Sequence, residues 1–232
     1  MLERLKKIKE LSEVPMRDDS EMKRVEIIIL KYKEEPGVIG ECVNRIVNHT
    51  TWPFKLNIFD NRGNTANTSR AWNKLVREST CDYICLIDSD AFIPEGIKPC
   101  WMTRMMESIQ ESGIVVPMGD NVGGANKATE AEPYPSHIKD VGIWSGFCFL
   151  FKKSVLDEVG WFDEDFHIYG QDSEFAHRAN KKGHPAVYRK DVFVQHIGGY
   201  SFHKAEKEGE VDREADKQYA ASLYRLKTKG KL

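Results

Sequence analysis

The sequence lacks an excess of either charge. Its 34 lysine and arginine residues nearly balance 36 aspartate and glutamate residues, which gives a formal net charge of -2. A protein that binds nucleic acid or anionic lipid through electrostatics carries a strongly basic surface or stripe. The composition therefore gives no clear footprint for a nucleic-acid partner.

Long apolar segments are also lacking. The longest apolar run, VGIWSGFCFLF, covers only residues 141–151, whereas a membrane-spanning helix needs about 20 residues. The first residues, MLERLKKIKELSEV, are charged throughout and contain no apolar stretch like that of a signal peptide. We therefore expect a soluble protein without a transmembrane segment, cytoplasmic and at most peripheral at a membrane.

Cysteines are few, and their spacing fits neither a metal knuckle nor a disulfide framework. A chain of 232 residues can be stabilised by its own core, so we interpret the five cysteines as reduced and structural, as in cytoplasmic proteins. No internal repeat or low-complexity linker divides the chain. One main domain is therefore expected.

The first residues have their own pattern. Leucine and isoleucine recur at helical spacing among charged residues, which predicts an amphipathic helix over 1–20. Such a helix packs on its own domain, packs on a second subunit of a homo-oligomer, or lies on a membrane surface. The sequence leaves these alternatives open.

Beyond residue 20, strand and helix patterns alternate. Apolar, β-branched runs predict strands, and amphipathic runs between them predict helices. The order predicts an α/β fold with an open, mostly parallel twisted sheet and helices on both faces. The expected strands are 25–30, 54–60, 83–88, 113–118, 142–153, 185–189 and 192–196, and the expected helices are 34–50, 70–80, 98–111, 153–160, 171–183 and 204–228.

Two aspartates stand directly after the buried strand YICLID. Asp88 and Asp90, separated by Ser89, would repel each other and lose hydration there unless a cation joined them. Ligands bind outside the carboxyl ends of strands in such sheets, and hard oxygen ligands favour Mg²⁺ or Mn²⁺ shared with a phosphate. The alternative is a turn or a helix cap, which is our interpretation of the similar triplet at 163–165.

Five motifs follow one another along the chain. They are Asp60-Asn61, Arg70 to Asn73, Asp88-Ser89-Asp90, the stretches Gly146 to Lys153 and Gly160 to Glu164, and Asp172 with Glu174, Arg178 and His196. In this order they resemble glycosyltransferase family 2 enzymes of the GT-A fold, especially rhamnosyltransferase-like members, and the resemblance covers residues 24–201. Departures are Lys31-Tyr32-Lys33 after the first strand and Gln171-Asp172 before the later helix.

The resemblance implies a division of the chain and a set of roles. The GT-A domain would cover 21–203, with a nucleotide-binding half at 21–118 and an acceptor and catalytic half at 119–203, followed by a helical tail at 204–232. Asp90 and His196 would hold Mn²⁺ or Mg²⁺, and Asp88 would support the metal or contact the ribose. The implied nucleotide-sugar contacts are Tyr32, Asp60, Asn61, Arg62, Arg70, Asn73, Asp88 and Ser89.

The acceptor side is implied by the same resemblance. Asp172 would be the general base, unless it only caps its helix, and Glu174 would be the alternative base or an acceptor contact. Trp144 would stack on a sugar and Gly146 would lie beside it. The polar segment 119–140 would be either a mobile loop over the site or plain surface.

The implied activity is transfer of a sugar, with inversion, from a UDP, dTDP or GDP sugar to an acceptor hydroxyl. A sugar-nucleotide nucleotidyltransferase is the first rival, but it would need a glycine-rich phosphate loop after the first strand. An inactive GT-A-like binding or scaffold protein is the second rival, and it predicts a broken metal or base position. The acceptor is left open.

Overall fold

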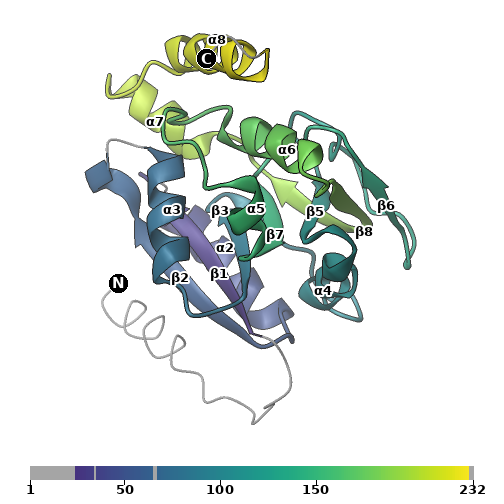
Figure 1. Ribbon diagram of the computed structural model, residues 1–232. Helices are drawn as coiled ribbons and strands as arrows, with labels where there is room; N and C mark the ends of the chain where they lie inside the picture. Colours follow the sequence, from purple (N-terminus) through teal and green to yellow (C-terminus); the bar gives the residue numbers. More distant parts are fainter. Residues whose placement is uncertain (1–23, 34, 65–66, 230–232) are drawn as a thin grey trace.

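A computed structural model describes residues 24–33, 35–64 and 67–229 (Figure 1). The helix expected at 1–20 lies outside the described residues. No helix in the described ranges is long and apolar enough to cross a membrane.

The core of the fold is one eight-stranded sheet in the order β2-β1-β3-β7-β5-β8-β4, with β6 paired to β8. Strands β1, β2, β3, β5 and β8 run in one direction, and β7, β4 and β6 run against them. The expectation of an open, mostly parallel sheet is confirmed. The strands are β1 (Val25–Lys31), β2 (Phe54–Asp60), β3 (Tyr83–Asp88), β4 (Ala91–Phe92), β5 (Ile114–Gly119), β6 (His137–Asp140), β7 (Cys148–Lys152) and β8 (Ala186–His196).

Helices cover both faces of the sheet. The apolar face of α2 and α4 packs with Ile27 and Ile29 of β1 in one core, whereas α3, α5 and α6 pack with Ile28 in the other. Successive strand residues point to opposite faces, and this is why the run VEIIIL is apolar almost throughout. The helices are α2 (Pro36–His49), the 3₁₀ helix η1 (Asn61–Asn64), α3 (Thr68–Glu78), α4 (Trp101–Ser112), α5 (Val155–Val159), α6 (Gln171–Lys181), α7 (Tyr200–Lys207) and α8 (Arg213–Thr228).

Strand β8 differs from the expectation of two short strands. It is continuous, and its register against β5 shifts between Pro117 and Met118, which pair with Arg189 and Phe193. The intervening residues form a bulge, which bends a strand without ending it. The polar residues of the bulge are typical of a loop, and this is why the sequence predicted a break between two strands.

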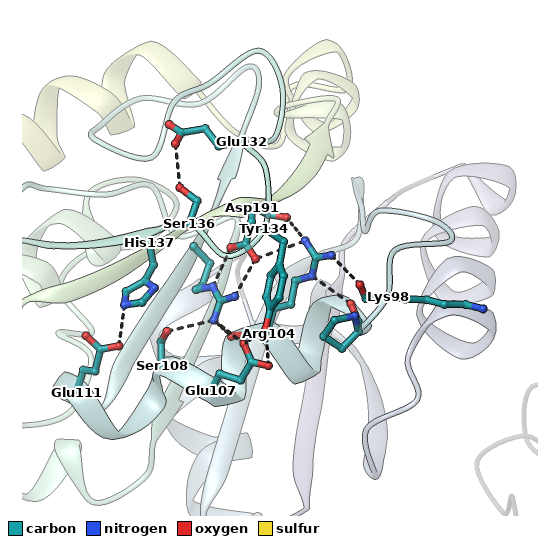
Figure 2. Close-up of polar contacts among 12 residues, drawn as sticks. Lys98, Arg104, Glu107, Ser108, Glu111, Glu132, Tyr134, Ser136, His137 and Asp191 are labelled. Carbon is teal, nitrogen blue, oxygen red and sulfur yellow. Dashed lines mark hydrogen bonds and ion pairs between the residues drawn. The ribbon is translucent and has the colours of Figure 1, made fainter.

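The bulge is fixed by a buried polar network, which also holds segment 119–140. Asp191 accepts hydrogen bonds from Arg189 (2.8 Å to each oxygen) and lies 3.4 Å from Arg104. Figure 2 shows the ring of Tyr134 beside Arg104, with its hydroxyl directed to Glu107. Because β6 also pairs with β8 and backbone hydrogen bonds tie other parts of the segment to its neighbours, most of the segment is anchored. Of the two alternatives expected for it, this arrangement favours a surface segment over a mobile loop.

The C-terminal residues form two helices where the sequence predicted one. The chain turns between α7 and α8 at Gly209, which has a positive φ of 73°. Of the large apolar side chains Tyr219, Leu223 and Leu226 on α8, only Leu223 is buried, and it packs with Phe166. In Figure 1, α7 and α8 lie at the top of the view, next to α6. The domain boundary expected at 203 stays a prediction, although α7 runs across it.

Candidate active site

The candidate site is a cavity of about 540 Å³ at the carboxyl ends of β1, β3 and β8. Parallel strands deliver their last residues to the same edge of a sheet, so positions far apart in sequence meet here. The cavity is lined by eight of the expected site residues: Tyr32, Asn61, Asp88, Ser89, Asp90, Gly146, Asp172 and His196.

Asp88, Asp90 and His196 form a cluster that could hold a metal ion, because one ligand atom of each lies within 4.8 Å of the others. Asp88 ends β3, and the pairing of Ala91 in β4 with His196 at the end of β8 brings the histidine to the aspartates. The imidazole Nε2 lies 3.3 Å from an Asp90 oxygen and 3.5 Å from an Asp88 oxygen. Strand pairing therefore builds the cluster.

The electrostatics of the cluster fit a cation between the three side chains. Desolvation inside the cavity raises the pKa of Asp88 to about 6 although its side chain is partly exposed, and His196 opposes this effect. Burial lowers the pKa of His196, but the two carboxylates outweigh this effect and raise the pKa to about 10. Both ring nitrogens of His196 are buried, and among the described residues neither has a hydrogen-bond partner of good geometry. Buried polar atoms left in this state usually have a ligand or water.

His196 is also held in place by its neighbours. Its ring stacks on Phe147 at 5.1 Å between centroids, its backbone N–H donates to Asp120 (2.6 Å), and its carbonyl accepts from Asn121 (3.0 Å). A metal ligand needs such support to keep its orientation.

Asp172 lies in the first turn of α6, on another wall of the cavity. One carboxylate oxygen accepts from the Gly146 N–H (2.7 Å), and the other accepts from the Ser173 N–H (2.7 Å). A Cβ on Gly146 would lie 2.7 Å from the Asp172 Cβ, so a residue without a side chain is needed there. Burial raises the pKa of Asp172, and the two N–H donors oppose this effect. The N-cap of α6 is Gly170, not Asp172.

Four of the expected nucleotide contacts lie outside the cavity. Asp60 and Arg62 form an exposed pair with each other, and exposed Arg70 pairs with Glu164 at 3.3 Å. Asn73 is buried. Its side-chain Nδ2 donates to the backbone carbonyl of Phe162 (2.8 Å), and its Oδ1 accepts from the backbone N–H of the same residue (3.0 Å). The structure therefore gives Asn73 a packing role, and it does not bring the other three to the cavity wall.

The structure also corrects two acceptor-side expectations. Trp144 is 1% exposed and its ring packs against Phe149 and Phe175 in the core, so no ring face is open for a sugar. Glu174 is buried and bound by both Nε (2.6 Å) and Nη2 (2.7 Å) of Arg178. Within the first turn of α6, Asp172 therefore faces the cavity, whereas Glu174 faces Arg178 of the same helix.

Other cavity residues were not expected from the sequence. Gln171 precedes Asp172, and the buried oxygen Oε1 of its side-chain amide has no hydrogen-bond partner among the described residues. Asn121 comes from the loop after β5, and Arg213 comes from the start of α8. The glycine pair after His196 was a signal for a close backbone approach, whereas nothing in the local sequence marked Arg213.

Parts of the chain match known proteins in sequence. The family model for glycosyl transferase family 2 matches residues 21–196. Chondroitin synthase of Pasteurella multocida is 38% identical over 81 residues, which are 33% of this chain and 8% of that protein. An N-acetylglucosaminyl-diphospho-decaprenol L-rhamnosyltransferase of Mycobacterium tuberculosis is 35% identical over 63 residues, which are 27% of this chain and 20% of that protein. The chain therefore matches only a small part of the length of these relatives.

Solved structures share the fold at low sequence identity. The crystal structure of GalNAc-T7 with UDP, GalNAc and Mn²⁺ has a TM-score of 0.58 and 12% identity, covering 77% of this chain and 44% of that one. S. aureus TarS 1-349 in complex with UDP has a TM-score of 0.55 and 14% identity, covering 88% and 72%. Since the family model covers most of the chain, including the whole Asp88, Asp90 and His196 cluster, the chain belongs to glycosyl transferase family 2 and has the GT-A fold.

Proposed function

We propose that this protein is a metal-dependent glycosyltransferase that moves a sugar, with inversion, from a nucleotide-diphosphate sugar to an acceptor hydroxyl. The observation that carries the proposal is that one cavity contains both the Asp88, Asp90 and His196 cluster and the carboxylate of Asp172. A leaving diphosphate needs a cation, and an attacking hydroxyl needs a base. The cavity supplies groups for both tasks.

Asp88, Asp90 and His196 would hold the divalent ion. When bound, the ion supplies a positive charge that stabilises the departing diphosphate. The mixed ligand set favours Mn²⁺ over Mg²⁺, because imidazole is a poorer ligand for Mg²⁺ than for transition metals. The presence of Mn²⁺ in the GalNAc-T7 structure supports the same choice.

Asp172 would accept the proton of the acceptor hydroxyl. Each of its oxygens accepts one backbone hydrogen bond, and Oδ1 also accepts from the Ser173 hydroxyl at 3.3 Å. A carboxylate oxygen can accept two hydrogen bonds, so Oδ2 has capacity for the acceptor hydroxyl. The raised pKa of Asp172 makes it a stronger base than an ordinary carboxylate. Tyr32, Asn61 and Ser89, which line the same cavity, would contact the nucleotide.

The rival activities have less support. A nucleotidyltransferase would need a basic residue after β1 that is directed at a phosphate. The side chain of Lys33, which follows β1, instead pairs with Glu208 and Glu210. An inactive scaffold protein would be expected to lack a metal ligand or the base. Here the three candidate ligands Asp88, Asp90 and His196 and the candidate base Asp172 all line one cavity.

The test is calorimetric titration of UDP, dTDP and GDP, each with and without Mn²⁺, on the full chain. UDP is the first choice, because the TarS and GalNAc-T7 structures contain UDP. Metal-dependent binding of one nucleotide supports the proposal and identifies the donor class. Absence of binding by all three would favour the scaffold alternative.

A further inference from the structure

Arg213 brings a cation to the candidate active site from outside the family-matched region. It is the first residue of α8 and lines the same cavity as the metal cluster, although the family model ends at residue 196. Its side chain is only 13% exposed. Among the described residues that line the cavity, it is the one arginine or lysine.

The guanidinium is held in a fixed orientation by the protein. Nε donates to the Tyr169 hydroxyl at 2.8 Å, Nη1 lies 2.8 Å from Nε2 of His203, and the same Nη1 is 3.9 Å from Glu206. In the described parts of the chain, no group accepts a hydrogen bond from Nη2. These contacts preorganise the side chain and leave one edge of the guanidinium for a ligand.

The glycines after His196 leave room for this arrangement. A Cβ on Gly199 would lie 2.9 Å from Nη2 of Arg213, and a Cβ on Gly198 would lie 3.9 Å from the His196 ring. The chain from His196 to Gly199 spans at most about 11 Å. The metal cluster and Arg213 therefore flank one short stretch of backbone in the cavity wall.

Charge indicates what this edge would bind. The carboxylates of Asp88 and Asp90 would offset the charge of a divalent ion, and Asp172 adds a further negative group to the same cavity. A bound nucleoside diphosphate carries several negative charges, so the cluster alone leaves part of that charge uncompensated. A rigid guanidinium suits phosphate oxygens through paired, charge-assisted hydrogen bonds.

We infer that Arg213 binds the diphosphate of the nucleotide-sugar donor, so that α7 and α8 complete the donor site. The inference rests on the proposed function, since it requires a nucleoside diphosphate in the cavity. It adds a binding residue that comes from the segment after the family-matched domain.

The test compares Arg213→Gln, Arg213→Lys and the matched control Arg225→Gln, which changes an exposed arginine on the same helix. UDP, dTDP and GDP are titrated with Mn²⁺ by calorimetry. The nucleoside of the nucleotide that binds (uridine, thymidine or guanosine) is measured by saturation-transfer NMR. Arg213→Gln is expected to weaken diphosphate binding about 10- to 100-fold and to leave nucleoside binding unchanged. Arg213→Lys should recover part of the affinity, and Arg225→Gln should bind like the wild type.

The possible failures can be distinguished. If the wild type binds a nucleotide and Arg213→Gln binds it equally well, the inference is wrong and the proposed function stands. If Arg213→Gln loses nucleoside as well as diphosphate, and its thermal melting falls, Arg213 has a structural role and the inference is again wrong. If the wild type binds none of the three nucleotides, both the proposed function and the inference fail.

Discussion

Asp88 and Asp90 are two positions apart, yet the structure gives them different surroundings. The side chain of Asp88 is 46% exposed, whereas that of Asp90 is 7% exposed, and both lie near Nε2 of His196. A buried carboxylate is stable only when a partner compensates its charge. We therefore expect Asp90 to be the anchoring metal ligand and Asp88 to be the one that also reaches the donor.

Replacement of Asp90 by asparagine should reduce both Mn²⁺ affinity and turnover more than about 100-fold, since even outer-shell residues contribute 10- to 100-fold. The measurements are Mn²⁺ titration followed by paramagnetic resonance, and sugar transfer. The matched control is Asp165→Asn in the second Asp-x-Asp triplet, where Asp165 pairs with Lys227 at 2.8 Å on the surface. Equal Mn²⁺ affinity in wild type and Asp90→Asn would remove the metal assignment.

Asp172→Asn should lower kcat by about 10²- to 10⁴-fold, the usual contribution of a general base. A raised pKa keeps the carboxyl protonated, and unable to accept a proton, up to a higher pH. The wild-type rate should therefore fall as pH decreases through a midpoint above about 4, the ordinary value for aspartate.

The check is kcat against pH at saturating substrates, with Glu174→Gln as the comparison variant. Because Arg178 occupies the carboxylate of Glu174, Glu174→Gln should keep the acidic limb, whereas Asp172→Asn should lose it. The opposite result would make Glu174 the base.

At the scale of elements, the last two helices close one side of the site. Helix α7 packs through Ala205 against Tyr32 and Ile168, and α8 packs through Ala220 and Leu223 against Phe166. These clusters are small compared with the two main cores. Their small packing area makes α8 more open to local unfolding than the described helices that pack in the two main cores.

Leu223→Ala should weaken the docking of α8 by about 2 kcal/mol, the lower end of the usual range for a buried leucine. The control is Leu226→Ala on the same helix, where the side chain is 42% exposed and the change should stay within about 0.5 kcal/mol. Amide hydrogen exchange along α8 measures both. Equal protection in the two variants would show that the helix is not held by Leu223.

At the scale of the whole molecule, the sheet is stabilised by a buried charge network as well as by apolar packing. Asp191 lies beside Arg104 of α4 (Figure 2), and its carboxylate also accepts a hydrogen bond from Arg189 of β8. Removing one member of a buried charge group leaves the others uncompensated. The network therefore links the helix face to the strand that ends at His196.

Asp191→Ala should lower the global free energy of unfolding by about 3 to 5 kcal/mol. Glu132→Ala, which breaks the surface pair with Lys190, should cost less than about 1 kcal/mol. Urea unfolding followed by circular dichroism measures both values. Comparable losses in the two variants would mean that the buried position of Asp191 adds nothing.

The sequence by itself determined the sheet strands of the first half, the helices between them and the carboxylates at the strand ends. These features depend on local periodicity and on chain order, and the strands expected at 54–60 and 83–88 have the observed bounds. The acidic cluster could be expected because apolar runs that end in aspartates leave those groups at one sheet edge.

Only the tertiary structure decided which polar residues face the cavity. The motifs predict Asn73 and Trp144 as ligand contacts. In the structure, Asn73 instead forms a hydrogen bond with the backbone of Phe162, and the ring of Trp144 packs against Phe149. Arg213 reaches the cavity only because α7 and α8 fold back over the strand ends. Side-chain direction and long-range docking depend on residues distant in sequence, so no local pattern could have fixed them.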